Sequence, residues 1–138
     1  MDRISRVKSL LDALHLPVFA MEHLLETADY CLKLAELRGE NGELACIAGL
    51  LHDVMFYLSG SPLNHARRSA DWAWEQLREL GCFDEEELKQ IHGAIYLHSD
   101  KDIVHGPLEE ILKDADILQK RQYGVRLQRL MLELEENM

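Results

Sequence analysis

The stretch ELACIAGLLHDVMF, residues 43–56, decides the fold. On a helical wheel at about 100° per residue, its large apolar side chains cover more than half of the circumference. Ala45, Gly49 and Phe56 fill most of the remainder. A helix that is apolar almost all round belongs in the interior of a protein. We therefore expect residues 43–57 to form the buried central helix of an all-α domain.

Two polar residues, His52 and Asp53, stand side by side near the end of this apolar stretch. A buried carboxylate is costly unless it is paired or binds a metal ion. The small residues Ala45 and Gly49 would let a neighbouring helix approach the pair closely. The stretch alone leaves two interpretations open. The pair either binds a metal ion, or it is a structural His–Asp hydrogen bond or a solvated helix end.

Helical periodicity continues on both sides of this stretch, and no alternating strand pattern persists. Pro17, Asn64, Asp84 and Pro107 are suited to begin helices, and Gly39 and Gly81 are suited to end them. The further helices predicted are residues 2–14, 17–37, 64–80, 84–98, 107–119 and 123–136. We expect a compact helical bundle of about six to seven helices that forms a single domain over residues 1–138.

Composition and charge narrow the class of protein. The chain is 47% hydrophobic and 29% charged, which is typical of a globular domain, and its net charge is -10 at pH 7. Such a surface repels a phosphate backbone, so we expect no long nucleic acid as partner, whereas a small nucleotide gripped by a metal ion remains compatible. Cys31, Cys46 and Cys82 show no CxxC spacing, which favours reduced core thiols. We expect a cytoplasmic protein with no membrane partner.

Further histidines lie where they can reach the interior. His23 and His98 fall on the apolar stripes of the 17–37 and 84–98 helices, and His65 opens the 64–80 helix. A single histidine on such a stripe is more often a packed core or boundary residue than a metal ligand. Facing helices of a bundle can, however, present several such side chains to one internal point. Imidazole and carboxylate ligands together suit Mn, Fe, Co, Ni or Zn.

The 107–119 helix contributes two carboxylates, Asp114 and Asp116, which flank its apolar stripe on opposite sides. We expect one of them to reach into the core while the other meets solvent. Periodicity does not choose between them.

Five segments of the chain form a series with a recognisable order and spacing. They read EHLLETADYCLKLAE (22–36), IAGLLHDV (47–54), NHARRSADWAWEQL (64–77), IHGAIYLHS (91–99) and ILKDADIL (111–118). This series resembles the HD superfamily of metal-dependent phosphohydrolases. LLHD together with the later DAD is its most specific part. The resemblance implies an HD-domain-like helical fold.

The resemblance also implies roles for individual residues. The metal ligands would be His23, His52, Asp53 and Asp116, and the metal a divalent ion of the kinds named above or Mg. His65 and His98 would hold a second ion or touch the substrate phosphate. Asp53, His65 and His98 are accordingly the candidate catalytic residues.

The chemistry implied is the hydrolysis of a small phosphate ester, possibly a nucleotide. Proximity in the sequence makes Arg67, Lys101 and Lys113 candidates to neutralise the phosphate. Two alternatives stay open: a non-enzymatic, metal-stabilised binding or regulatory module, and an oxygenase with a di-iron centre. The first is supported by departures from many relatives, which have Arg, Glu and Asp at the positions of Glu26, Ala66 and Gln119.

The last predicted helix, residues 123–136, is acidic and amphipathic. Its apolar side chains can cover the core of the same chain or pair with a second copy. A homodimer is therefore a possible assembly.

Overall fold

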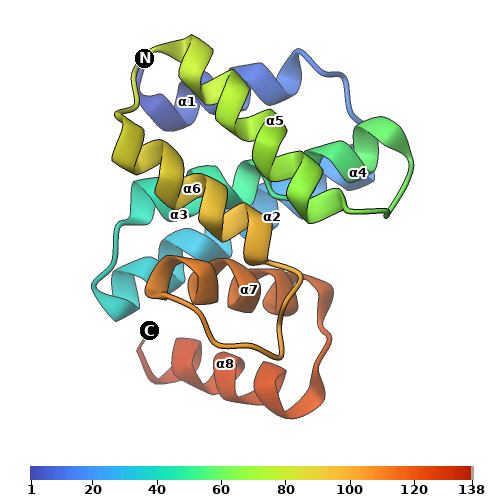
Figure 1. The fold of residues 1–138 in the computed structure, drawn as a ribbon. Coiled ribbons are helices and arrows are strands. Elements are labelled where there is room, and N and C mark those ends of the chain that lie inside the picture. The colour runs from blue at the N-terminus through green and yellow to red at the C-terminus, as the bar shows by residue number, and fades with distance from the viewer. Residues whose placement is uncertain (138) are drawn as a thin grey trace.

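The regular structure of the protein is entirely helical over residues 1–137, the part of the chain that the computed structural model describes (Figure 1). Its helices are α1 (Arg3–Asp12), α2 (Val18–Arg38), α3 (Gly42–Leu51), α4 (Val54–Ser59), α5 (His65–Leu80), α6 (Glu85–Leu97), α7 (Pro107–Lys120) and α8 (Gly124–Glu136). The predicted all-α bundle is confirmed.

Helix α3 lies at the centre of this bundle, as its apolar circumference predicts. Every residue from Leu44 to Leu51 is buried. It packs against α1, α2, α6 and α7, while α1 and α8 lie at opposite ends of the molecule (Figure 1). The core is therefore built around the segment that ends in the His–Asp pair.

The helix predicted over residues 43–57 is divided in two at His52 and Asp53. The backbone of Asp53 leaves helical geometry, with φ -120° and ψ 13°, and α4 begins at the next residue. The N–H of Met55, near the start of α4, is bonded instead by the hydroxyl of Ser69, at 3.0 Å. On an unbroken helix, adjacent side chains diverge by about 100°. The break therefore allows both polar side chains to face the same interior point.

The ends of most helices follow the sequence signals. Asp84 and Glu87 form a capping box at the start of α6, and Gly39 and Gly81 end their helices with φ of 69° and 73°. Asn64 differs from the prediction. It precedes α5, but its own φ is 51° and its side chain makes no capping hydrogen bond. An N-cap residue needs extended backbone to reach the first amides of the helix, and left-handed backbone does not provide it.

Gly49 marks the close approach of α2 and α3. A Cβ atom at this position would lie 2.9 Å from the Cα atom of Ala28. Only glycine permits this approach without displacing the backbone of α2. The contact brings the middle of α2, and with it His23, close to the end of α3.

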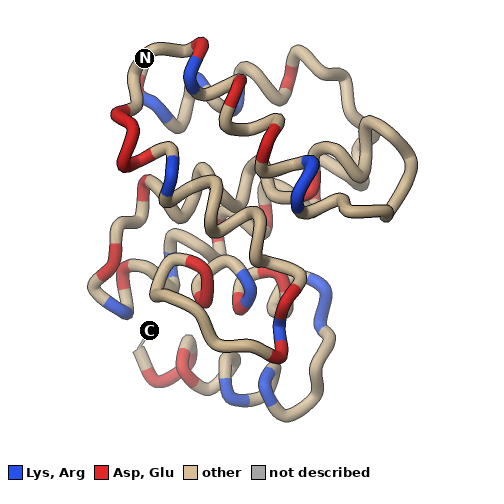
Figure 2. The backbone as a smooth tube through the Cα atoms, in the orientation of Figure 1, with Lys and Arg blue, Asp and Glu red and all other residues tan. Residues whose placement is uncertain are grey.

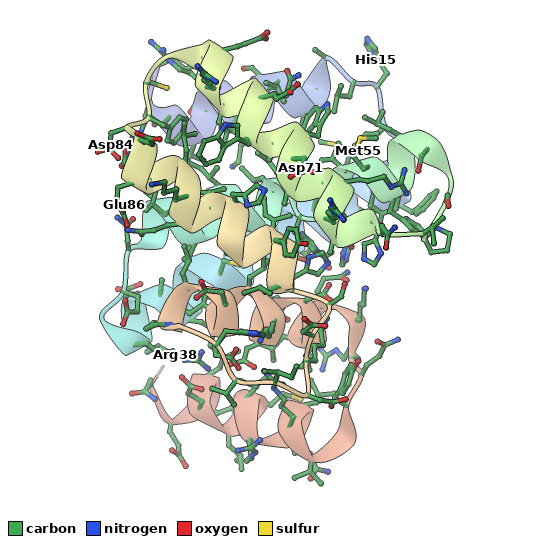
Figure 3. All side chains as sticks on the ribbon, viewed as in Figure 1. His15, Arg38, Met55, Asp71, Asp84 and Glu86 are labelled. Atoms are coloured by element: carbon green, nitrogen blue, oxygen red, sulfur yellow. The ribbon has the colours of Figure 1, made fainter. Side chains whose placement is uncertain are left out.

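Helix α8 is attached by Leu130, its one buried residue among those described, and by several ion pairs. Arg38, at the end of α2, contacts Asp114 at 2.8 Å and Glu133 at 3.0 Å (Figure 3). Arg126 of α8 contacts Asp114 at 2.7 Å. Figure 2 shows that basic and acidic residues are mixed along α7 and α8. The expectation that either Asp114 or Asp116 meets solvent is wrong, because this network buries Asp114 as well.

The segment Gly42–Ser59 is apolar enough and long enough to cross a membrane by composition alone. It is, however, 61% buried inside the bundle, as expected for the core of a helical domain. It therefore gives no indication of a membrane protein. Cys31, Cys46 and Cys82 are free, and the first two are buried.

Candidate metal centre

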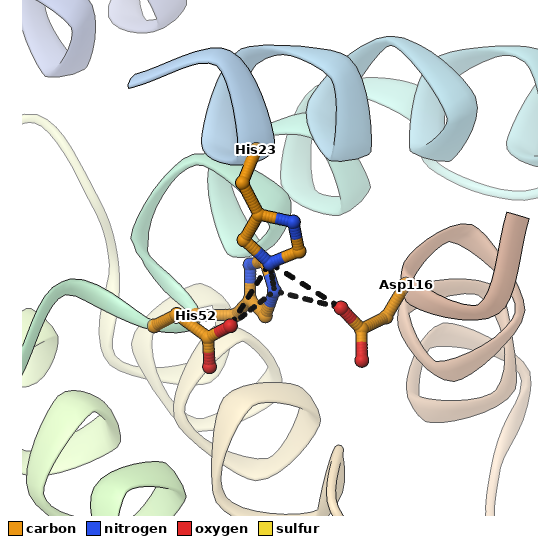
Figure 4. Close-up of side chains that lie close together, drawn as sticks. His23, His52 and Asp116 are labelled. Atoms are coloured by element: carbon orange, nitrogen blue, oxygen red, sulfur yellow. Dashed lines mark hydrogen bonds and ion pairs between the residues drawn. The ribbon is translucent and has the colours of Figure 1, made fainter. Parts of the chain in front are cut away.

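Four side chains from three parts of the chain converge inside the bundle (Figure 4). His23 comes from α2, His52 and Asp53 from the α3–α4 break, and Asp116 from α7. All four are buried. The Nε2 atom of His23 lies 3.1 Å from Nε2 of His52, 2.9 Å from Oδ2 of Asp53 and 3.4 Å from Oδ1 of Asp116. Segments far apart in sequence thus meet at one point.

The spacing of these atoms suits a shared metal ion. Nε2 of His52 lies 3.2 Å from Oδ2 of Asp53 and 3.3 Å from Oδ1 of Asp116. Two donors bound at about 2.1 Å to one ion lie about 3.0–3.4 Å apart in octahedral or tetrahedral geometry. The donors are nitrogen and oxygen atoms, which divalent transition metals accept. The four residues therefore fit such an ion.

The orientation of the histidine rings is fixed by their other nitrogen atoms. Nδ1–H of His52 donates to the carbonyl of Gly49 at 2.7 Å, and Nδ1–H of His98 donates to that of Ile95 at 2.6 Å. Both histidines follow the last residue of a helix, where carbonyls lack a partner within the helix. His65 makes a similar bond to the carbonyl three residues before it. In the neutral form of all three rings, Nε2 therefore carries the lone pair.

His23 is oriented differently, by a side chain. Its Nδ1–H donates to Oε1 of Gln119 on α7, and Nε2 of Gln119 donates to Glu26 at 3.1 Å. Glu26 and Gln119 are two of the positions distinguished in the sequence analysis from the pattern of the resembled family. They contact each other, so the two departures form one local unit beside His23. This unit supplies the acceptor that the ring requires.

The two carboxylates and two imidazole rings favour a cation at the centre of the cluster. With their Nδ1 atoms protonated, His23 and His52 direct two lone pairs at each other and at two carboxylates. Burial lowers the pKa of His52, but the charges of Asp53 and Asp116 outweigh it and raise that pKa to about 10. The same contacts hold the carboxyl pKa of Asp116 below its usual range, although burial opposes this. A proton or a metal ion satisfies this arrangement.

A second group of donors shares Asp53 with the first. Its Oδ1 atom lies 3.1 Å from Nε2 of His98 and 3.4 Å from Nε2 of His65. Burial lowers the pKa of His98 and so favours its neutral form, which can bind a metal ion or accept a proton. Asp53 thus directs one oxygen atom at each group of histidines.

Four basic residues can be compared as contacts for an anion. Nζ of Lys101 lies 2.8 Å from Oδ2 of Asp116, and Arg67 is exposed beside His65 in a neighbouring cavity. The structure does not bring Lys113 to the cluster. Its fully buried ammonium group contacts the Ile103 carbonyl, His105 and Glu110 instead. Lys120, which sequence reasoning missed, lies 3.5 Å from Asp116 at the mouth of the site.

The family to which the chain belongs agrees with this geometry. The HD-domain profile matches residues 20–121, which include every residue of the two donor groups. The chain is an HD-domain protein. No match was found among curated proteins or among solved structures. HD domains are generally metal-dependent phosphohydrolases, although some members are not enzymes, and this HD domain has a buried His–Asp group able to hold a metal ion.

Proposed function

We propose that this HD-domain protein is a divalent-metal-dependent phosphohydrolase that acts on a small phosphate ester. His23, His52, Asp53 and Asp116 would hold the metal ion. The observation that carries the proposal is the convergence of two imidazole Nε2 atoms and two buried carboxylates on one point. A purely structural His–Asp pair needs one donor and one acceptor, whereas this cluster brings four donor residues to a point that a proton or a metal ion completes.

The residues around the ion have distinct proposed roles. When bound, the ion supplies a Lewis acid that polarises the phosphoryl group and acidifies water. With one ion present, Oδ1 of Asp53 and neutral His98 are placed to orient the attacking water and accept its proton. His65, which is partly exposed, contacts the phosphate. With two ions, His65 and His98 hold the second.

The surroundings of the cluster favour a small substrate. The cavity that opens onto Asp53 has a volume of about 240 Å³. Lys120 at its mouth can neutralise phosphate charge, while Lys101 is committed to Asp116. The net charge of -10 disfavours long polyanions. A compact ester, such as a nucleotide, meets all three conditions.

Metal content provides the direct test. Wild-type protein is purified without added metal, and elemental analysis is run beside His52→Ala and a control, His92→Ala. His92 bonds the exposed Asp71 of α5, which Figure 3 labels, and belongs to neither donor group. We expect one or two transition-metal ions per chain in wild type and in His92→Ala, and loss of metal in His52→Ala.

A panel of phosphate esters, assayed with the metal that binds, completes the test. Hydrolysis that disappears in His52→Ala supports the phosphohydrolase. Intact metal without hydrolysis of any ester favours the non-enzymatic module, and a stoichiometry of two irons favours the oxygenase. Wild-type protein that takes up neither Mn nor Ni would leave His52 and Asp53 as a structural pair and refute the proposal.

A further inference from the structure

The mouth of the metal centre has two chemically different sides. The cavity of about 240 Å³ is lined by Asp53, Phe56, Tyr57, His65 and Lys120. The Asp53 carboxylate belongs to the metal centre, Phe56 and Tyr57 come from α4, and Lys120 ends α7. A molecule in this cavity therefore meets an aromatic wall from α4 and a cation from the end of α7.

The aromatic wall is a corner formed by two rings. The centroids of Phe56 and Tyr57 lie 5.3 Å apart, with 84° between the ring planes. Phe19 extends the wall, since its ring meets Tyr57 edge-on at 5.8 Å and remains 65% exposed. A ring left this exposed contributes little to the core. Because the Phe19 ring is clustered with two further aromatic rings beside the metal centre, we explain it as part of a surface that a ligand covers.

The cation in this cavity is Lys120, whose ammonium group is held only loosely. Lys120 is 39% exposed and lies 3.5 Å from Asp116, longer than a charge-assisted hydrogen bond. Lys101, by contrast, is 9% exposed and bonded to the same carboxylate at 2.8 Å. Lys120 can therefore turn to a bound anion at little cost. Movement of Lys101 would instead leave the buried carboxylate of Asp116 without this partner.

From this juxtaposition we infer the class of substrate: a phosphate monoester of a flat, uncharged aromatic group. The ring lies in the Phe56–Tyr57 corner, and the phosphate lies between Lys120 and the His–Asp cluster. Hydrolysis forms a bond from the oxygen of water to phosphorus and breaks the ester bond on the other side. The products are inorganic phosphate and the ring-bearing alcohol or phenol, whose oxygen takes up a proton. The inference rests on the proposed function, and Phe56 and Tyr57 are its specificity-determining residues.

Binding of two phosphonates tests the inference without any reaction. Phenylphosphonate and methylphosphonate carry the same anionic group, but only the first has a ring, and neither has an ester bond to hydrolyse. Calorimetry on the metal-loaded protein should show phenylphosphonate bound about tenfold more tightly, the value of a good aromatic contact. Phe56→Leu and Tyr57→Leu should each lower this ratio several-fold. Tyr57→Phe, which keeps the ring, should preserve it.

Tyr96→Leu is the matched control. Tyr96 is 42% exposed and lines a different cavity, which shares His65 with the first and includes Arg67 and Ser99. The ratio should be unchanged in this variant. A lowered ratio in Tyr96→Leu but not in Tyr57→Leu would place the ring in that other cavity and overturn the inference. A wild-type ratio near one, or no measurable binding of phenylphosphonate, would overturn it as well.

Hydrolysis assays separate this inference from the function on which it rests. Equal kcat/KM for phenyl phosphate and glycerol phosphate would retain the phosphohydrolase and refute the aromatic subsite. A tenfold binding ratio that depends on Tyr57, without hydrolysis of any ester, would retain the subsite and refute the phosphohydrolase. Preference for phenyl phosphate that Phe56→Leu and Tyr57→Leu both reduce, mainly through KM, is the result expected.

Discussion

Helix α7 carries two buried aspartates that belong to two different polar assemblies. Asp114 faces α8 and the end of α2, and it accepts hydrogen bonds from Arg126 of α8 and from Arg38 of α2. Asp116 faces α2 and α3, where its Oδ1 atom meets the lone-pair sides of two imidazole rings. Asp114 has its positive charges already in place. Asp116 has Lys101 on its Oδ2 atom, but its Oδ1 atom lies among other acceptors.

The comparison shows that burial alone does not identify a functional carboxylate. Positions 114 and 116 lie on opposite sides of the helix, and each is covered by a packed element. What separates them is the character of their partners. A carboxylate whose two oxygen atoms are both matched by guanidinium groups holds elements together, whereas a carboxylate with one oxygen atom among acceptors needs a proton or a metal ion there.

The largest effect is expected from the shared ligand of the metal centre. Asp53→Ala should lower phosphohydrolase activity by about a thousandfold or more, because the metal is lost with it. Helical content, measured by circular dichroism, should stay. Asp71→Ala removes an exposed carboxylate bonded to His92 and should retain metal and activity. Normal metal content in Asp53→Ala would show that the donors do not act as a metal site.

Loss of Asp114, which is paired with two arginines, should lower stability and leave the metal content unchanged. Asp114→Ala leaves Arg38 and Arg126 without their common partner and should lower the free energy of unfolding by about 2 kcal/mol, because both guanidinium groups are partly buried. Urea denaturation measures this loss, and elemental analysis should find the metal content unchanged. Loss of metal in this variant would mean that the two assemblies are not independent, with the bond from Arg126 to the Lys101 carbonyl as the connection.

A smaller effect is expected from the residue that orients His23. Gln119→Ala removes the acceptor of the His23 Nδ1–H group and should weaken metal affinity by about 10- to 100-fold without changing the number of ions bound. Gln90→Ala is the control, because Gln90 bonds only Glu86 on the exposed side of α6. Affinity within a factor of about two of wild type would show that the ring is held by packing alone.

The smallest effect concerns pH and the attachment of α8. The hydrogen bond from Arg38 lowers the pKa of Glu133, against the opposing effect of burial. A lowered carboxyl pKa contributes stability above its ordinary value of 4.5, and this is lost as the pH falls through the lowered value. Between about pH 6 and about pH 3, this group should lower the free energy of unfolding, measured by urea denaturation, by less than about 1 kcal/mol. Glu133→Gln should remove that part of the pH dependence. An identical pH profile in the variant would exclude Glu133 as its source.

Much of the fold could be predicted because helix positions follow from apolar stripes. The break at Asp53 could not, since Val54, Met55 and Phe56 continue the apolar pattern without interruption. The backbone turns there to direct two polar side chains at a site formed by other helices. A tertiary requirement of this kind leaves no trace in local periodicity.

Only part of the candidate metal centre could be predicted from the residues themselves. His52 and Asp53 stood out as polar residues in an apolar helix, but the residues that meet them were assigned through family resemblance. Periodicity could not separate Asp116 from Asp114, because both are buried. Lys120 went unnoticed because a basic residue in the last turn is ordinary helix chemistry. Its spacing of four residues from Asp116 was the available signal.

The bonds from Nδ1 of His52 and His98 to carbonyls three residues earlier bear on how such a centre can be constructed. Each ring takes its aim from the helix that carries it, so its direction does not depend on the rest of the bundle. A protein engineer could add a ligand of this kind to an unrelated scaffold by placing histidine just after a helix whose end points inward. Natural selection could assemble such a centre in the same way, one substitution at a time.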